Sequence, residues 1–184
     1  MKKLLHIGCG GAGREQVMLE DFRREEWDHL RVDIDSNVLP DVVDDMRTLV
    51  TVEDSSVDGV YSSHNLEHLH PNDSLKAMQT FLRVLKPGGI FFAVVPDVQI
   101  ACEWIARGDG LKTIYQSAAG PITPIDMVYG YRPFTFDNPF QMHRMGFTVA
   151  IMDWMIREAG FTQCKVQNGS GFDVWAYGEK NADS

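Results

Sequence analysis

The sequence predicts a doubly wound α/β fold, with a mostly parallel sheet in three α/β/α layers that ends in an antiparallel hairpin. Two observations carry this prediction. Short apolar runs alternate with helical patterns along the chain, which is typical of a parallel sheet with crossover connections. Near the C-terminus, two strand-like runs flank residues 168–171 (NGSG), a turn-forming stretch that indicates a hairpin.

The composition is typical of one globular domain, with 44% hydrophobic and 23% charged residues in a chain of 184. The apolar start reaches Gly8 too soon for a signal peptide or a membrane span. A net charge of −9 without runs of Lys or Arg argues against a nucleic-acid partner and favours a small-molecule partner.

The three cysteines are widely spaced, which fits a reducing compartment, so we expect a cytoplasmic protein. The oligomeric state stays open.

The first elements are expected in a simple order. Residues 4–7 form a strand that ends in a glycine-rich loop, residues 14–27 form a helix, and residues 30–34 form the second strand. Only five residues separate Asp35 from Asp41, whereas a helical crossover needs a dozen or more. We therefore expect no helix at this point and only a vestigial third strand.

The middle of the chain contains a strand, a helix and a central strand. Residues 57–62 predict the strand, and Asn72 is expected to cap the helix that follows. The apolar stripe of this helix is Leu75, Met78, Leu82 and Leu85. Residues 86–89 (KPGG) end the helix. Residues 90–95 are apolar throughout, as expected for a strand that is buried on both faces.

Residues 97–145 are rich in glycine, proline and aromatic residues. We expect a short helix at residues 98–107, followed by an irregular lid or substrate-binding insertion, because long irregular loops are usually functional. Its aromatic side chains fit either an acceptor pocket or a small core that holds the segment. These residues are Trp104, Tyr115, Tyr129, Tyr131, Phe134, Phe136 and Phe140.

The chain ends with a helix and a strand pair. Thr148 is expected to cap the helix and Gly160 to follow its end. The side chains expected on its buried side are Ile151, Trp154 and Met155. Residues 161–167 and 172–178 form the terminal hairpin.

A glycine-rich loop, residues 8–13 (GCGGAG), follows the first strand and formally fits G-x-G-x-x-G. Glycine lets the backbone approach a ligand closely, and a following helix N-terminus can hold an anion. Asp33, at the end of the second strand, can accept hydrogen bonds from ribose hydroxyls, with Asp35 as its rival. A dinucleotide, an adenosyl methyl donor and a plain tight turn without ligand all fit these two features.

Other segments of the chain favour the adenosyl methyl donor over the dinucleotide and the plain turn. Residues 57–69 (VDGVYSSHNLEHL) and 81–89 (FLRVLKPGG) closely resemble two signature segments of the class I S-adenosylmethionine-dependent methyltransferase family, which is Rossmann-like. Residues 41–46 (DVVDDM) resemble its adenine-contacting segment, and residues 146–161 are similar to its last helix and the start of its terminal hairpin. The resemblance implies one small, bacterial-type methyltransferase domain over residues 1–184. The insertion at about 97–145 belongs to this domain but is not covered by the resemblance.

The resemblance implies S-adenosylmethionine as cofactor and a set of binding residues. The methionine portion would lie along Gly8, Cys9, Gly10 and Gly11. The nucleoside would contact Asp33 at the ribose, and Ile34, Asp45 and Met46 at the adenine. Ser63 and His64 would lie near the methionine amino group and the transferable methyl. His6 stands where the family usually has an acid.

Residues 64–68 (HNLEH) match H-x-x-E-H, the inverted zinc-peptidase motif. That chemistry needs the three residues on one helix, whereas here the motif directly follows a strand. We therefore expect no metal, with Leu66 and Leu69 filling the core and Glu67 and His68 making local hydrogen bonds.

Methyl transfer to an oxygen or nitrogen of a small-molecule or sugar-like acceptor is the function that this combination predicts. His143 and His64 are the candidate general bases, if the acceptor must lose a proton. Arg144 is suited to an anionic acceptor. A non-catalytic domain that binds S-adenosylmethionine and a nicotinamide-dependent oxidoreductase remain the alternatives.

Overall fold

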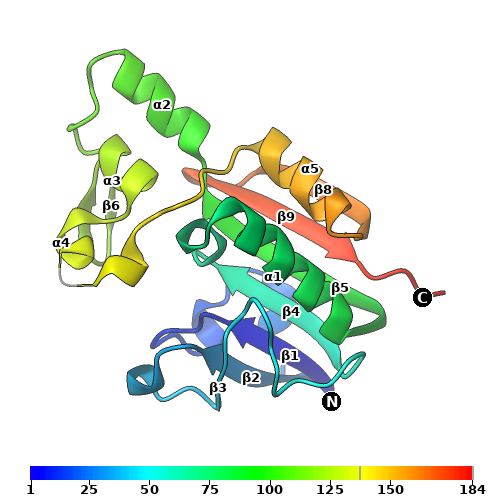
Figure 1. The fold of residues 1–184 in the computed structure, drawn as a ribbon. Helices are drawn as coiled ribbons and strands as arrows, with labels where there is room; N and C mark the ends of the chain where they lie inside the picture. Colours follow the sequence, from blue (N-terminus) through cyan, green and yellow to red (C-terminus); the bar gives the residue numbers. More distant parts are fainter. Residues whose placement is uncertain (137, 184) are drawn as a thin grey trace.

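The computed structural model describes residues 1–136 and 138–183. Its seven-stranded sheet has the order β3-β2-β1-β4-β5-β9-β8 (Figure 1). The strands are β1 (Lys2–Ile7), β2 (Trp27–Asp33), β3 (Val42–Val43), β4 (Val57–Ser63), β5 (Leu85–Pro96), β8 (Thr162–Asn168) and β9 (Asp173–Glu179). β9 runs antiparallel to both of its neighbours, and the other pairs are parallel. The predicted doubly wound sheet with a terminal antiparallel hairpin is confirmed.

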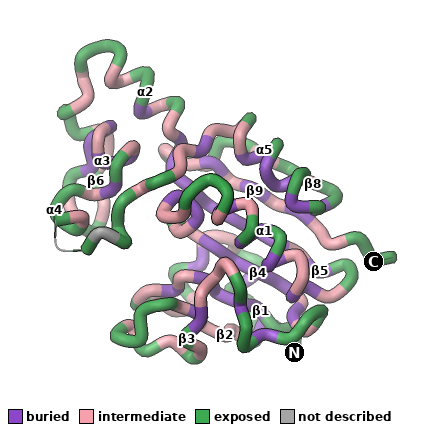
Figure 2. The backbone as a smooth tube through the Cα atoms, viewed as in Figure 1, coloured by how far each residue is buried: buried purple, intermediate pink, exposed green. Residues whose placement is uncertain are grey.

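Successive residues of a strand face opposite sides of the sheet. On one side, Leu5 and Ile7 of β1 pack in the larger core with residues of α1 (Pro71–Val84) and α5 (Val149–Glu158). On the other side, Leu4 belongs to a second core. The other buried residues of that core are Val17, Phe22, Trp27, Tyr61, Phe92 and Val94. Figure 2 shows buried stretches along the central strands of the sheet.

The prediction of a helix at residues 14–27 is wrong. This segment forms two short 3-10 turns, η1 (Arg14–Gln16) and η2 (Glu20–Arg23), and β2 already begins at its last residue. Tertiary contacts replace helical hydrogen bonds here, since Met18 N donates to Tyr61 Oη at 3.0 Å. In this segment, the second side of the sheet is therefore covered by 3-10 turns in place of an α-helix.

The bounds of α1 differ slightly from the prediction. His70 is the N-cap and Pro71 the first helical residue, so Asn72 is not the cap. Proline is favoured at this first position because its φ is already helical and its missing N–H costs no hydrogen bond there. Leu85, which was predicted to belong to the apolar stripe of the helix, is instead the first residue of β5.

The cap of α5 is confirmed, because Thr148 Oγ1 accepts a hydrogen bond from Ile151 N at 3.2 Å. The expected burial of Trp154 is wrong, since this side chain is 57% exposed. The buried residues of α5 are Met152, Met155 and Ile156.

The short link after β2 is also as expected. It contains only the 3-10 turn η3 (Ser36–Val38) before β3, which is two residues long. β3 still pairs in parallel with β2, with Val32 opposite Val42 and Asp33 opposite Val43. The vestigial third strand is therefore confirmed.

Residues 97–145 form an ordered group of small elements at one end of the sheet, in place of the irregular segment expected (Figure 1). They are α2 (Val98–Ala106), β6 (Tyr115–Ser117), β7 (Gly120–Ile122), α3 (Pro124–Tyr129), α4 (Arg132–Thr135) and η5 (Pro139–Gln141). A small core of Ala101, Ile122 and Met127 holds them together. Residue 137 lies outside the described residues. None of the helices in the described part of the chain is long and apolar enough to span a membrane.

Candidate functional site

A cavity of about 860 Å³ lies at the carboxyl ends of β1, β2 and β4, where open α/β sheets bind their ligands. Most of the predicted binding residues line it, namely Gly8, Gly10, Asp33, Ile34, Asp45, Met46, Ser63 and His64. Of the predicted residues that the structure describes, Cys9, Gly11 and His143 are not among those that line it. The predicted residues thus gather at one cavity and form part of its wall.

The glycine-rich loop has the backbone conformation that glycine favours. Gly8 and Gly10 have φ angles of +59° and +51°, in the left-handed region. A Cβ atom on Gly8 would overlap the side chain of Asn65, whereas a Cβ on Gly10 or Gly11 would meet nothing within 4 Å. The loop therefore presents bare backbone to open space.

Asp33 joins the end of β2 to this loop. Its Oδ2 accepts a hydrogen bond from Gly10 N at 2.8 Å, and its Oδ1 accepts one from Asp35 N at 3.0 Å. Each carboxylate oxygen has two lone pairs, so both keep capacity for a ligand hydroxyl. Its rival Asp35 is instead the N-cap of η3, where Oδ1 accepts from Asn37 N at 2.9 Å.

Arg31 joins the two loops that border the cavity through hydrogen bonds. The sequence analysis did not predict this role. Its guanidinium donates to the carbonyl oxygens of Gly10 at 3.1 Å, Leu39 at 3.2 Å and Val38 at 3.4 Å. A lone arginine in a strand gives no sequence signal for such a clamp. Only the adjacency of the loops after β1 and β2 creates it.

Asp45 lies in the cavity wall but is already engaged by Arg47. Its carboxylate accepts from Arg47 Nη2 at 2.6 Å, Nε at 3.0 Å and backbone N at 2.9 Å. The hydrogen bonds from Arg47 lower the pKa of Asp45. Arg47 and Asp73 also line the cavity and were not predicted. These contacts use most of the acceptor capacity of Asp45.

Comparison with known proteins agrees with this geometry. Residues 5–93 match the family model described as a methyltransferase domain. The match includes the glycine-rich loop, Asp33 and the two signature segments. Residues 5–93 therefore form a methyltransferase domain, consistent with the class I S-adenosylmethionine-dependent family that the motifs resemble. Its cofactor is S-adenosylmethionine.

Solved structures share the fold of this methyltransferase. A possible exported protein from Bordetella parapertussis is 17% identical, with a TM-score of 0.63 over 98% of this chain and 62% of that chain. A possible histamine N-methyltransferase from Thermotoga maritima is 17% identical, with a TM-score of 0.63 over 98% and 83%. A methyltransferase from Archaeoglobus fulgidus is 16% identical, with a TM-score of 0.62 over 97% and 86%.

These identities show a common fold and nothing finer. The chain spans less than two thirds of the Bordetella parapertussis protein. The comparison with curated protein sequences gives no match. The acceptor of the methyltransferase therefore has to be argued from the cavity itself.

His64 follows β4 in a left-handed conformation, with φ +55°, and lines the cavity. Its Nδ1 lies 3.6 Å from Oε1 of Glu67, a buried carboxylate. Burial lowers the pKa of His64, but the pairing with Glu67 outweighs burial and raises the pKa above its usual value. His64 is thus the candidate base that the structure places at the cavity.

Only the last three residues of the H-x-x-E-H motif lie on a 3-10 turn, η4 (Leu66–His68), and His64 directly follows the end of β4. The expectation that no long helix runs through the motif is confirmed. Leu66 is buried and His68 Nδ1 lies 3.2 Å from the carbonyl oxygen of Met142, as local packing and hydrogen bonding predicted. For Glu67 the prediction is wrong. Neither of its carboxylate oxygens has a hydrogen-bond partner within residues 1–136 and 138–183.

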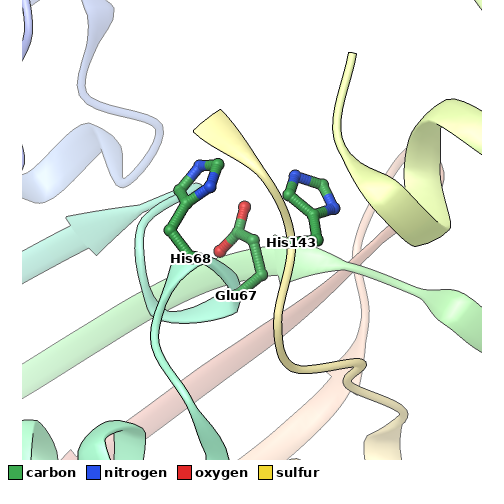
Figure 3. A group of neighbouring side chains, drawn as sticks. All are labelled: Glu67, His68 and His143. Carbon is green, nitrogen blue, oxygen red and sulfur yellow. The ribbon is translucent and has the colours of Figure 1, made fainter. Parts of the chain in front are cut away.

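His143, the other candidate base, lies behind this turn. Its Nδ1 is 2.8 Å from the carbonyl oxygen of Met127, and its ring centroid is 4.9 Å from that of His68. Burial lowers the pKa of His143. Figure 3 shows His143, His68 and the Glu67 carboxylate pointing toward one another.

Three aromatic residues of the insertion take one of the two expected roles, whereas Tyr129, Phe134 and Phe136 are largely exposed. Phe140 lines the cavity. Tyr115 and Tyr131 pack on the small core of the insertion, and Tyr115 stacks on Phe172 at 5.3 Å. Other cavity residues from this segment are Asn138, Gln141 and Arg144. Arg144 Nη1 also donates to the carbonyl oxygen of His68 at 2.7 Å.

Proposed function

We propose that this enzyme transfers a methyl group from S-adenosylmethionine to an oxygen or nitrogen of a small-molecule or sugar-like acceptor. The volume and the lining residues of the cavity support this proposal. Its volume of about 860 Å³ lies within the ~300–1,000 Å³ range of small-molecule sites. One side is the glycine-rich loop with Asp33, and the other side is formed by residues of the insertion.

The residues present fit an adenosyl group. Asp33 is held in place by backbone N–H groups and keeps lone pairs for both ribose hydroxyls. The exposed side chain of Ile34, together with Met46, gives the adenine ring an apolar surface. For Asp45 to accept from the adenine amino group, Arg47 would have to release one of its bonds.

The methionine portion of the cofactor fits the bare backbone of the loop. Gly8, Cys9, Gly10 and Gly11 would lie along it, and Ser63 would face its amino group. Gly8, Gly10 and Ser63 line the cavity. His6, in the position of the usual family acid, is buried and outside that wall, so we assign it no contact with the cofactor.

When bound, S-adenosylmethionine supplies a methyl group on an activated sulfonium, which departs as a neutral thioether. The protein therefore has no leaving group to protonate, and its main task is to hold donor and acceptor in line and exclude water. His64 is positioned to take a proton from an acceptor hydroxyl or amine. Arg144 would pair with an anionic acceptor.

We propose that the insertion, residues 97–145, covers the acceptor. Asn138, Phe140 and Gln141 bring two amide groups and one aromatic ring to the cavity, a set suited to a polar organic molecule. The net charge of −9 disfavours a nucleic-acid acceptor. The three cysteines are unpaired, in line with the proposed cytoplasmic location.

A ligand screen tests this function. S-adenosylhomocysteine should raise the melting temperature of the purified protein, and NADH should not. Mass spectrometry of ligand retained on purification should identify an adenosyl thioether or sulfonium. Transfer of labelled methyl to a small-molecule fraction of cell extract supports catalysis. Stabilisation by NADH alone would favour an oxidoreductase, and tight cofactor binding without any transfer would favour a non-catalytic domain.

A further inference from the structure

Three side chains from two distant parts of the sequence meet beside the cavity. One ligand atom each from Glu67, His68 and His143 lie within 4.8 Å of one another (Figure 3). Backbone hydrogen bonds bring the two segments together, because Arg144 N and Met145 N donate to the carbonyl oxygen of Glu67 at 2.7 and 3.1 Å. The grouping is therefore part of the fold.

Glu67 lacks the partners that a buried carboxylate needs. It is 2% exposed, and both oxygens are without a hydrogen bond in the part of the chain that the structure describes. His64 Nδ1, at 3.6 Å, is too far for a hydrogen bond. Burying a charged group without compensation is costly, so such a group in a native fold calls for an explanation.

Both histidines are oriented in a way that leaves one ring nitrogen available. His68 Nδ1 lies 3.2 Å from the carbonyl oxygen of Met142. His143 Nδ1 lies 2.8 Å from the carbonyl oxygen of Met127. A carbonyl oxygen can only accept, so each Nδ1 carries the hydrogen and each Nε2 carries the lone pair. Histidines that ligate metals are commonly held by the same kind of hydrogen bond.

We propose that Glu67, His68 and His143 form a binding site for a divalent transition-metal cation. Two imidazoles and one carboxylate are a donor set suited to Zn²⁺ and its first-row neighbours, whereas Mg²⁺ and Ca²⁺ prefer oxygen ligands. The cation would give the two Glu67 oxygens the short-range partner that they lack, since the ion pair with His64 is 3.6 Å long. Because His68 also lines the cavity, the cation would lie beside the proposed acceptor space.

This site differs from the peptidase-type site that the H-x-x-E-H motif suggests. Such a site needs His64 and His68 on one helix, and the structure has a strand end and a 3-10 turn there. The third ligand comes from the insertion in place of the motif. The sequence alone did not indicate it, because His143 is 75 residues after His68.

Metal titration of the chelator-treated protein tests the proposal without cofactor or acceptor. We expect Co²⁺ and Zn²⁺ to bind with a stoichiometry of about one per chain, to raise the melting temperature more than Mg²⁺ does, and Co²⁺ to give a visible ligand-field spectrum. Glu67→Gln and His143→Ala should each weaken Co²⁺ binding at least about a hundredfold. His70→Gln, which changes a histidine of the same loop outside the cluster, should leave Co²⁺ binding unchanged.

A second measurement separates metal binding from a structural role. Glu67→Gln removes a buried charge whose oxygens accept no hydrogen bond, so without metal its melting temperature should equal or exceed that of the unmodified protein. A lower melting temperature with an intact Co²⁺ response would overturn the proposal. So would the lack of any Co²⁺ or Zn²⁺ response in the unmodified protein, or a response that survives in both Glu67→Gln and His143→Ala. None of these results bears on cofactor binding at Asp33, so the two proposals fail independently.

Discussion

The side chain of Asn65 occupies the space that a Cβ atom on Gly8 would need. Asn65 is held there because its Nδ2 donates to the carbonyl oxygens of Ile7 at 2.9 Å and Ser63 at 2.8 Å. One amide thus joins the end of β1 to the end of β4 directly under the glycine-rich loop. Only glycine fits at position 8.

Gly8→Ala should therefore lower the free energy of unfolding by about 2–4 kcal/mol, through the left-handed φ and the overlap with Asn65 together. Gly10→Ala is the matched control, since Gly10 has a similar φ but open space around its Cβ position. Its loss should be about 1–2 kcal/mol. Urea unfolding measures both. Equal losses would show that the Asn65 contact does not matter.

Asp33→Ala should weaken binding of S-adenosylhomocysteine by well over tenfold. The change removes the proposed ribose acceptor and also the bond that holds Gly10 N, and a hydrogen bond to a charged group contributes about 1.5–3 kcal/mol. Asp35→Ala, the neighbouring control, should change affinity by less than about threefold, because Asp35 caps η3. Titration calorimetry gives both constants. Unchanged affinity in Asp33→Ala would remove the ribose assignment.

His6 should make stability depend on pH. Burial, with smaller effects of His29 and Arg31, lowers the pKa of His6 from 6.5 to about 4 in the folded protein. Between these two values the unfolded chain binds the proton more readily, so stability falls as the pH falls from 6.5 toward 4. The loss should approach roughly 3 kcal/mol, and His6→Leu should reduce it.

Urea unfolding at several pH values across that window measures the effect. His70→Gln serves as the control, because His70 is exposed and should not alter the slope. An identical pH dependence in His6→Leu and the unmodified protein would contradict the assignment to His6.

Asp126→Asn should loosen the insertion selectively. This carboxylate is 3% exposed and accepts from Arg132 Nε at 2.7 Å and from Thr123 N at 2.9 Å. Because Arg132 is half-exposed, the expected cost is about 1–2 kcal/mol, below that of a fully buried pair. Hydrogen exchange should become faster in α3 and α4 while β4 and β5 keep their protection.

Asp153→Asn is the matched control for that change. Its partner Arg157 lies at 2.9 Å on the surface of α5, and both side chains are exposed. The cost there should stay below about 0.5 kcal/mol. If the two variants lost the same stability, the ion pair between Asp126 and Arg132 would have no special role in the insertion.

The sequence by itself determined the order of most strands along the chain, the place of the cavity and part of its wall. Apolar runs, turn residues and the count between Asp35 and Asp41 are local signals, and local signals decide where a strand starts, where it ends and whether a helix fits between two strands. Since ligands gather at the carboxyl ends of parallel strands, Asp33 and the glycine-rich loop followed from the same reading.

Only the tertiary structure decided how segments without a regular pattern are used. Residues 14–27 had a pattern compatible with a helix, yet the segment forms two 3-10 turns, held by contacts such as Met18 N to Tyr61 Oη. Likewise, Arg31 became a clamp and His143 joined Glu67 because the fold brings distant loops together. The periodicity of apolar residues does not predict such long-range contacts, since they depend on how the chain packs and not on spacing along the sequence.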